Sequence, residues 1–130
     1  MSTLKTGKVK TTTIADELDT ESTDVTNVIN GSAKAWVNFN GQGTVAIRKS
    51  FNISSITDVA VGKYTANFET AMPDSNYVIV SISADISVAG IGSIGIVSGT
   101  GFTTTTAALG TVNSGGSWYD QSNCMYTFFG

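Results

Sequence analysis

The sequence predicts an all-β protein, an antiparallel β-sandwich of the jelly-roll kind behind an extended N-terminal arm. Short segments of alternating apolar and polar residues recur along residues 33–82, separated by turn-forming residues. Only 13% of the residues are charged, against roughly 25% in typical soluble domains, and Ser, Thr, Asn and Gly take their place. The 130 residues suffice for one folded domain, which we place at 33–130, after an arm at 1–32.

The arm is expected to be mostly extended. Its apolar residues are scattered, and its runs of Thr favour extended backbone. A short helix at 14–19 is an alternative, because Ile14 and Leu18 are four residues apart, but a helix of this length is marginal alone. The turn-forming sequence NGS at 30–32 ends the arm.

The alternation is clearest in the middle of the chain. We expect a first core hairpin formed by Trp36, Val37 and Phe39 before the turn NGQG at 40–43. A turn near Gly62 precedes another alternating run, which consists of Tyr64, Ala66 and Phe68. The next run has Tyr77, Ile79 and Ser81 on one face and Val78, Val80 and Ile82 on the other. Because both faces are largely apolar, this run predicts a strand buried on two sides.

The last third of the chain is also β-prone. It contains a glycine-rich run, GIGSIG at 90–95, a turn-rich segment at 113–123 and a final apolar strand at 124–130. From Gly90 onward the only charged side chain is Asp120. Such a surface suits a chain that packs against copies of itself better than a free monomer.

Several partners are excluded by charge and composition. The net charge of −3 and the dispersed Lys and Arg residues argue against nucleic acid, which needs a clustered basic face. No apolar run is long enough to span a membrane, and we expect no signal peptide. A single cysteine, Cys124, leaves no intrachain disulfide and fits assembly in a reducing cytoplasm.

The sequence offers no catalytic, cofactor or metal site. Without histidine, Ser–His–Asp and Cys–His catalysis and most zinc sites are excluded. Cys124 lacks a neighbouring base or cation and is interpreted as a buried thiol in a strand. The GIGSIG run matches a dinucleotide-binding pattern, but the glycines that follow prevent the helix which that motif needs. The carboxylates lie in the arm or near turns and suit a solvated surface.

A few residues are candidates for contact with a partner. Trp118 and Tyr119 lie in the loop GGSWYDQSN beside Gln121, where aromatic and amide groups stack on sugars or anchor a subunit interface. The scarcity of charge around them favours the interface over carbohydrate. In the arm, Ile14 and Leu18 are the candidate contacts.

Residues 33–80 resemble a module of tailed bacteriophages that occurs in tail-fibre proteins and in small virion proteins. The matching elements are AWVNFNG (35–41), SFNISSITD (50–58), GKYTANF (62–68) and AMPDSNYVIV (71–80). The resemblance implies a non-enzymatic, β-rich, homotrimeric component of the virion, assembled in the host cytoplasm. An apolar last strand is typical of such proteins, and YTFFG at 126–130 fits it.

Two roles follow from this resemblance. The first is a capsid-decorating (cement) protein whose arm clasps the major capsid protein or neighbouring copies, and the charge blocks of the arm favour it. The alternative is a tail-fibre module that binds host surface polysaccharide through loops including Trp118 and Tyr119. We expect no fibre shaft, because only residues 1–32 precede the module.

Overall fold

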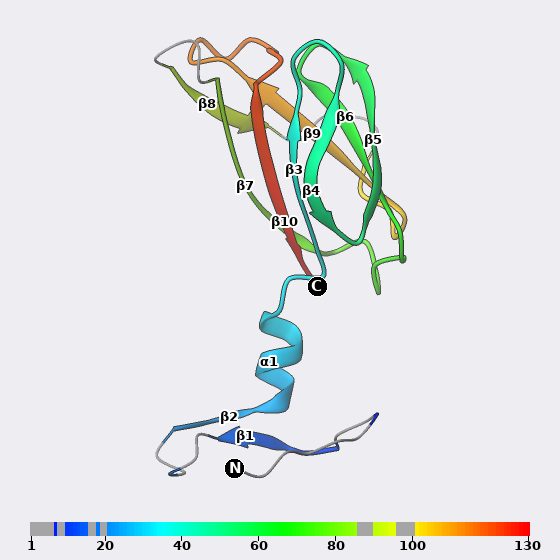
Figure 1. Cartoon of the computed structure of the whole chain (residues 1–130), viewed down its shortest axis with the longest axis vertical. Helices are drawn as coiled ribbons and strands as arrows, with labels where there is room; N and C mark the ends of the chain where they lie inside the picture. The colour runs from blue at the N-terminus through cyan, green and yellow to red at the C-terminus, as the bar shows by residue number, and fades with distance from the viewer. Residues whose placement is uncertain (1–6, 8–9, 16–17, 19–20, 86–89, 96–100) are drawn as a thin grey trace. The chain divides into compact units, whose positions relative to one another are not determined.

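A computed structural model describes residues 7, 10–15, 18, 21–85, 90–95 and 101–130, with the backbone alone over 90–95. The chain divides into two compact units, residues 1–32 and 33–130, which are described separately here. Almost all of the regular structure is antiparallel β-sheet, as the alternation predicts (Figure 1).

The N-terminal unit holds two short strands and one short helix. Strand β1 (Thr13–Ala15) pairs antiparallel with β2 (Ser22–Asp24), and helix α1 spans Val25–Gly31. The expected extended backbone is therefore wrong for residues 25–31. The Asp24 carboxylate caps this helix by accepting a 3.0 Å hydrogen bond from the Thr26 N–H, a local signal that the Thr runs obscured. Ile14 and Ala15 lie in β1, which is incompatible with the alternative helix at 14–19.

The second unit contains one eight-stranded sheet with the strand order β4-β3-β10-β7-β8-β9-β6-β5. Every neighbouring pair is antiparallel. The strands are β3 (Ala35–Asn40), β4 (Ala46–Phe51), β5 (Ile53–Ala60), β6 (Lys63–Phe68), β7 (Val78–Asp85), β8 (Gly90–Gly95), β9 (Thr106–Val112) and β10 (Asn123–Phe129).

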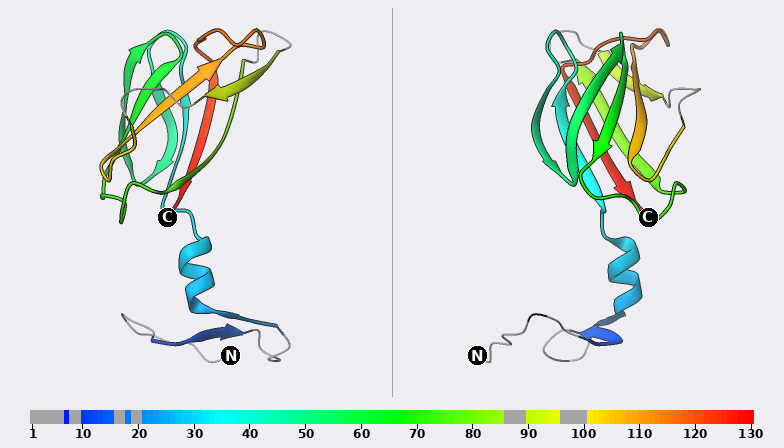
Figure 2. Two further views of the ribbon diagram at one scale, coloured as in Figure 1. Left: turned by 180° about the vertical axis from the view of Figure 1, so that it is seen from behind. Right: turned by 90° about the vertical axis from the view of Figure 1, so that its right-hand side faces the viewer.

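The sheet curls so that its two ends face each other across the core (Figure 2). Phe39 of β3 meets Tyr64 of β6 edge to face, with ring centroids 5.1 Å apart. Phe68 of β6 meets Phe128 of β10 in the same way at 5.2 Å. These ring pairs join strands that are distant in the sheet order, so the core lies between the halves β4-β3-β10-β7 and β9-β6-β5.

The predicted inward residues of β3 and β6 are confirmed. Ala35, Val37 and Phe39 are buried, and so are Tyr64, Ala66 and Phe68; the interpretation of Cys124 as a buried strand thiol is also confirmed. Trp36, however, does not join the core hairpin. It alternates with the buried residues of β3 and therefore lies on the outer side of the sheet.

Strand β7 differs from its prediction. The alternation itself is confirmed, because Tyr77 and Ser83 are buried while Val78, Val80 and Ile82 face the other way. Burial on two sides is wrong within this chain, since the three outward side chains are 61%, 59% and 55% exposed. The apolar outward row therefore needs an explanation other than the core.

Strand β8 contains the glycine-rich run and joins the two halves of the sheet. Its first residues pair with Ser83–Asp85 of β7, and its last residues pair with Gly110–Val112 of β9. All three glycines of the GIGSIG pattern lie in this strand, whereas a dinucleotide-binding turn needs them between a strand and a helix.

Candidate functional site

The outer side of strands β4, β3, β10 and β7 carries a group of exposed and half-buried apolar side chains, with Thr127 and Asn38 among them, and is here called the apolar face. Strand register places its residues in rows, because Trp36 pairs with Phe51 and Thr127, and Thr127 pairs with Val80. In the next row Met125 pairs with Ile82. The apolar members of the face are Trp36, Phe51, Val78, Val80, Ile82, Met125 and Phe129.

The only charges on the apolar face are positive. Arg48 and Lys49 of β4 lie at the β-bulge opposite Asn38 and Phe39. The Arg48 guanidinium donates hydrogen bonds to Asn38 Oδ1 (3.2 Å) and to the Ser122 carbonyl (2.6 Å), which fixes it beside the face. The one acid on these four strands, Asp85, is on the inner side and buried.

The outer side of β5 and β6 is polar by contrast. Its residues are Ser55, Thr57, Lys63, Thr65 and Asn67, with Ala60 and the exposed Val59 at the far end of β5. The Asn67 amide donates 3.0 Å hydrogen bonds to the hydroxyls of Ser55 and Thr57. The same fold therefore presents one outer surface suited to water and one suited to an apolar partner.

The loop at 113–122 presents the two predicted aromatic residues. Trp118 and Tyr119 are 38% and 36% exposed. The Lys63 ammonium lies 5.0 Å from the centre of the Trp118 ring, in cation–π distance. The backbone of Tyr119 is held on both sides, because its N–H donates to the Thr111 carbonyl (3.1 Å) and its carbonyl accepts from the Thr111 hydroxyl (2.6 Å).

Gln121, the third candidate in this loop, is not available to a partner. Its side chain is only 2% exposed, and its amide nitrogen donates to the Val112 carbonyl at 3.2 Å. Gln121 Oε1 and Ser83 Oγ find no hydrogen-bond partner among the described residues. Gln121 therefore fastens the loop to β9, and the prediction that it contacts a partner is wrong.

Two carboxylates hold the base of this loop. Asp120 accepts hydrogen bonds from the Gly62 N–H (2.6 Å) and the Tyr64 hydroxyl (2.8 Å). Asp85 accepts hydrogen bonds from the Tyr119 and Ser122 hydroxyls (both 3.4 Å) and from the Gln42 amide (2.6 Å). Burial, together with the hydrogen bond to Asp120, raises the pKa of Tyr64 above its usual range. These hydrogen bonds explain how the loop is positioned, and both carboxylates take part in them.

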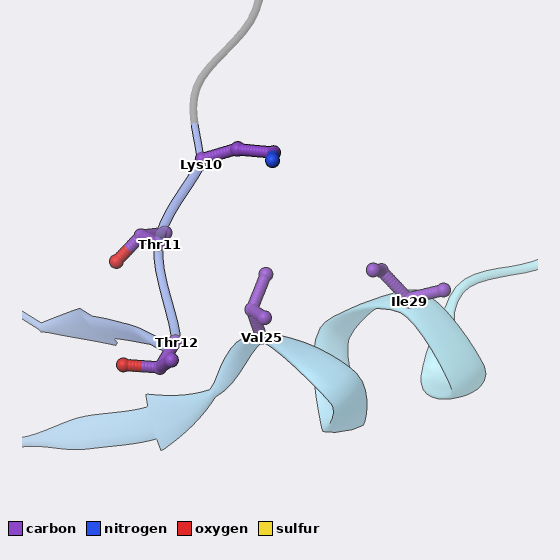
Figure 3. Close-up of a pocket in the computed structure, with 5 residues that line it drawn as sticks. All are labelled: Lys10, Thr11, Thr12, Val25 and Ile29. Carbon is purple, nitrogen blue, oxygen red and sulfur yellow. The ribbon is translucent and has the colours of Figure 1, made fainter.

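The candidates in the N-terminal unit are exposed. Ile14 and Leu18 both face solvent within the chain, as do Val28 and Ile29 of α1. Beside the helix, Lys10, Thr11 and Thr12 line a hollow together with Val25 and Ile29, and Figure 3 shows Lys10 on one side of it and Ile29 on the other. The Val25 N–H donates to the Thr12 carbonyl at 2.9 Å, which holds the two sides together.

The described residues hold no group of three or more His, Cys, Asp or Glu side chains placed to bind a metal ion. Cys124 is fully buried, and its burial raises the pKa of the thiol to about 12. Within the same residues, no helix has the length and apolar character needed to cross a membrane.

No protein family, curated protein or solved structure gave a significant match to this chain.

The apolar face is the candidate surface that sequence reasoning did not identify. The signal was present in the alternation at 77–82, where both faces are apolar. That signal was assigned to the core, because a sequence does not tell which side of a two-sided apolar strand remains uncovered.

Proposed function

We propose that this protein is a non-enzymatic structural component of a tailed-phage particle that assembles with copies of itself. Its second unit is a jelly-roll-like β-sandwich, the assembly is a homotrimer, and its role is to decorate and stabilise the capsid through the N-terminal unit. The observation that carries the proposal is the exposed apolar face. The resemblance of residues 33–80 to phage tail-fibre and small virion proteins supplies the setting.

The apolar face supports assembly because its exposure is costly in water. Val78, Val80 and Ile82 form a contiguous row, with Met125 beside Ile82 in the neighbouring strand. Each such side chain gains about 1.5–3 kcal/mol when it moves fully from water into an apolar contact. Contiguous exposed patches of this kind mark interaction sites in soluble proteins.

The N-terminal unit supports attachment to a further partner. Its exposed apolar residues and its acidic stretch at 16–24 suit docking onto a basic or mixed surface. In the decorating role this unit clasps neighbouring copies on the capsid lattice or the major capsid protein.

The non-enzymatic assignment is supported by the hydrogen bonds that two acids, one buried and one half-buried, make within the chain. Asp85 and Asp120 accept hydrogen bonds from Gln42, Gly62 and Tyr64 of the same chain. Groups committed in this way stabilise a loop, and they resemble the satisfied polar groups of a folded interior.

The test of this function is the number of copies in purified particles, measured by quantitative mass spectrometry against the major capsid protein. Hundreds of copies per particle are expected for a protein that covers the capsid lattice. Absence from the particle would overturn the virion role.

A tail-fibre receptor-binding module is the second candidate, and the exposed Trp118 with Lys63 above its ring favours it. Aromatic rings with a nearby cation are suited to host surface polysaccharide. On this alternative a particle holds a dozen or a few dozen copies, and Trp118→Ala abolishes adsorption while the particles remain intact. On the capsid role, the same variant leaves adsorption unchanged.

A further inference from the structure

We propose that the apolar face of one copy binds the N-terminal unit, residues 1–32, of a neighbouring copy. This inference rests on the proposed self-assembly and names the occupant of the surface that supports it. Two unsatisfied surfaces of the same chain would then cover each other in the assembly.

The N-terminal unit lacks a core of its own. None of its described residues is buried, its strands have three residues each and its helix has seven. Two-stranded ribbons and helices of this length are marginal in water without packing against something else. The unit therefore needs an apolar surface to stabilise it.

Helix α1 offers a matching apolar stripe. Val25, Val28 and Ile29 are three and four residues apart and so lie along one side of the helix. Val25 and Ile29 also line the hollow beside Lys10 (Figure 3), which leaves room for a protruding apolar side chain. The valine and isoleucine row of β7 is a set of such side chains.

The charges of the two surfaces are complementary. The apolar face has Arg48 and Lys49 along β4 and no outward acid. The N-terminal unit contains five acids between 16 and 24, of which Glu21 and Asp24 are described and exposed, and three lysines, Lys5, Lys8 and Lys10, so that its formal charge is −2. Attraction between these groups orients the unit on the face and disfavours contact between two basic faces.

The size of the face points to this occupant as well. Three inter-strand spacings and about five residues of length give a footprint of roughly 240 Å². Each partner in a standard stable interface buries about 800 Å². Two apolar faces in mutual contact bury less than this area on each copy. A copy that receives a neighbour's N-terminal unit and also gives its own to a neighbour buries two of its surfaces.

The connection between the units is short and begins at a fixed point. Only Ser32 and Ala33 separate α1 from Lys34. Lys34 is fixed, because its N–H donates to the Phe128 carbonyl at 2.8 Å and its carbonyl accepts from the Asn52 amide at 3.1 Å.

The experiment uses full-length chains with one new cysteine each, distinguished by tags of different mass. Ile29→Cys and Val80→Cys chains are mixed and treated with a short bismaleimide, and the products are identified by mass spectrometry. Native Cys124 is fully buried and does not compete. Thr57→Cys, on the polar outer side of β5, replaces Val80→Cys in the matched control, and circular dichroism verifies that each variant is folded.

The expected product contains one Ile29→Cys chain and one Val80→Cys chain, and the Thr57→Cys control gives little of it. Lys49→Glu is expected to lower the yield at low salt and not at high salt, while Lys63→Glu leaves it unchanged. Linkage of Val80→Cys chains only to each other overturns the proposal, as does absence of linkage. Linkage within one chain of a doubly substituted protein, independent of dilution, also overturns it. Because the copy number in particles is measured separately, failure here is distinguishable from failure of the proposed function.

Discussion

At the scale of single residues, Asn52 holds the corner between β4 and β5. Its φ of 55° is in the left-handed region, which Asn tolerates better than most residues. Its amide donates to the carbonyls of Lys34 and Thr70 (both 3.1 Å), and its Oδ1 accepts from the Thr70 N–H (2.7 Å). One side chain thus ties the two edge strands of the sheet to the segments that precede β3 and follow β6.

Replacement of Asn52 tests this role. We expect Asn52→Ala to lower the free energy of unfolding by about 3 kcal/mol, because it loses three hydrogen bonds and strains the backbone. Asn52→Gly removes the same hydrogen bonds and relieves the strain, so its loss should be about 1 kcal/mol smaller. Urea unfolding of the three proteins measures both differences. Equal stability of all three would contradict this account.

Cys124 makes stability depend on alkaline pH. Burial raises the pKa of the folded thiol to about 12, whereas the unfolded thiol ionises near 9. The unfolded state therefore loses its proton first, and the stabilisation present below pH 9 is lost as pH rises toward 12. Between pH 9 and 10 this loss is about 1 kcal/mol.

The variant Cys124→Ser isolates that contribution, since a serine hydroxyl does not ionise in this range. Urea unfolding between pH 7 and 10, under reducing conditions, should show a shallower decline above pH 9 for the variant than for the parent. Burial also raises the pKa of Tyr77 to about 12, but the parent and the variant share this group. Identical slopes in the two proteins would show that the thiol is not the cause.

At the scale of elements, the turn between β5 and β6 supports the aromatic loop. Gly62 has a φ of +66°, and a Cβ there would meet the Thr111 carbonyl and approach the Tyr119 nitrogen to 2.6 Å. Gly43, in the turn after β3, has a φ of +61° but no atom within 4 Å of a Cβ position. The two glycines share a backbone conformation and differ in crowding.

We expect Gly62→Ala to destabilise the protein by about 3 kcal/mol or more, through backbone strain and a clash that displaces Tyr119. Gly43→Ala should cost only about 1 kcal/mol, from backbone strain alone. Thermal unfolding and tryptophan fluorescence, recorded with Trp36 replaced by Phe so that Trp118 alone emits, report the two effects. Similar losses for both variants would mean that crowding at Gly62 is relieved elsewhere.

The elements also show what the sequence could and could not predict. Strands β3 and β6 were predictable because each has one side against the core. Buried residues such as Phe39 and Tyr64 therefore alternate with less buried ones along each strand. Helix α1 was missed because its apolar spacing covers a single turn, from Val25 to Ile29, and its cap is one local hydrogen bond from the Thr26 N–H to the Asp24 carboxylate. The position of Gln121 could not be predicted, because its amide binds the backbone carbonyl of Val112 and no sequence pattern indicates that contact.

At the scale of the whole molecule, we expect a new negative charge to affect self-association differently on the two outer surfaces. Val80→Asp puts a carboxylate into the apolar face and should dissociate the oligomer, which sedimentation velocity measures. Thr57→Asp makes a similar change on the polar side and should leave the assembly intact. Unchanged mass for both variants would show that the apolar face takes no part in self-association.

The polar side has a practical consequence as well. Thr57 and Ser55 are exposed on an edge strand whose neighbours are already hydroxyl and amide groups. A fluorophore or peptide ligand coupled at Thr57 through an introduced thiol would remain accessible when the opposite surface is occupied. On the proposed function, such a label would display cargo at regular spacing on a particle.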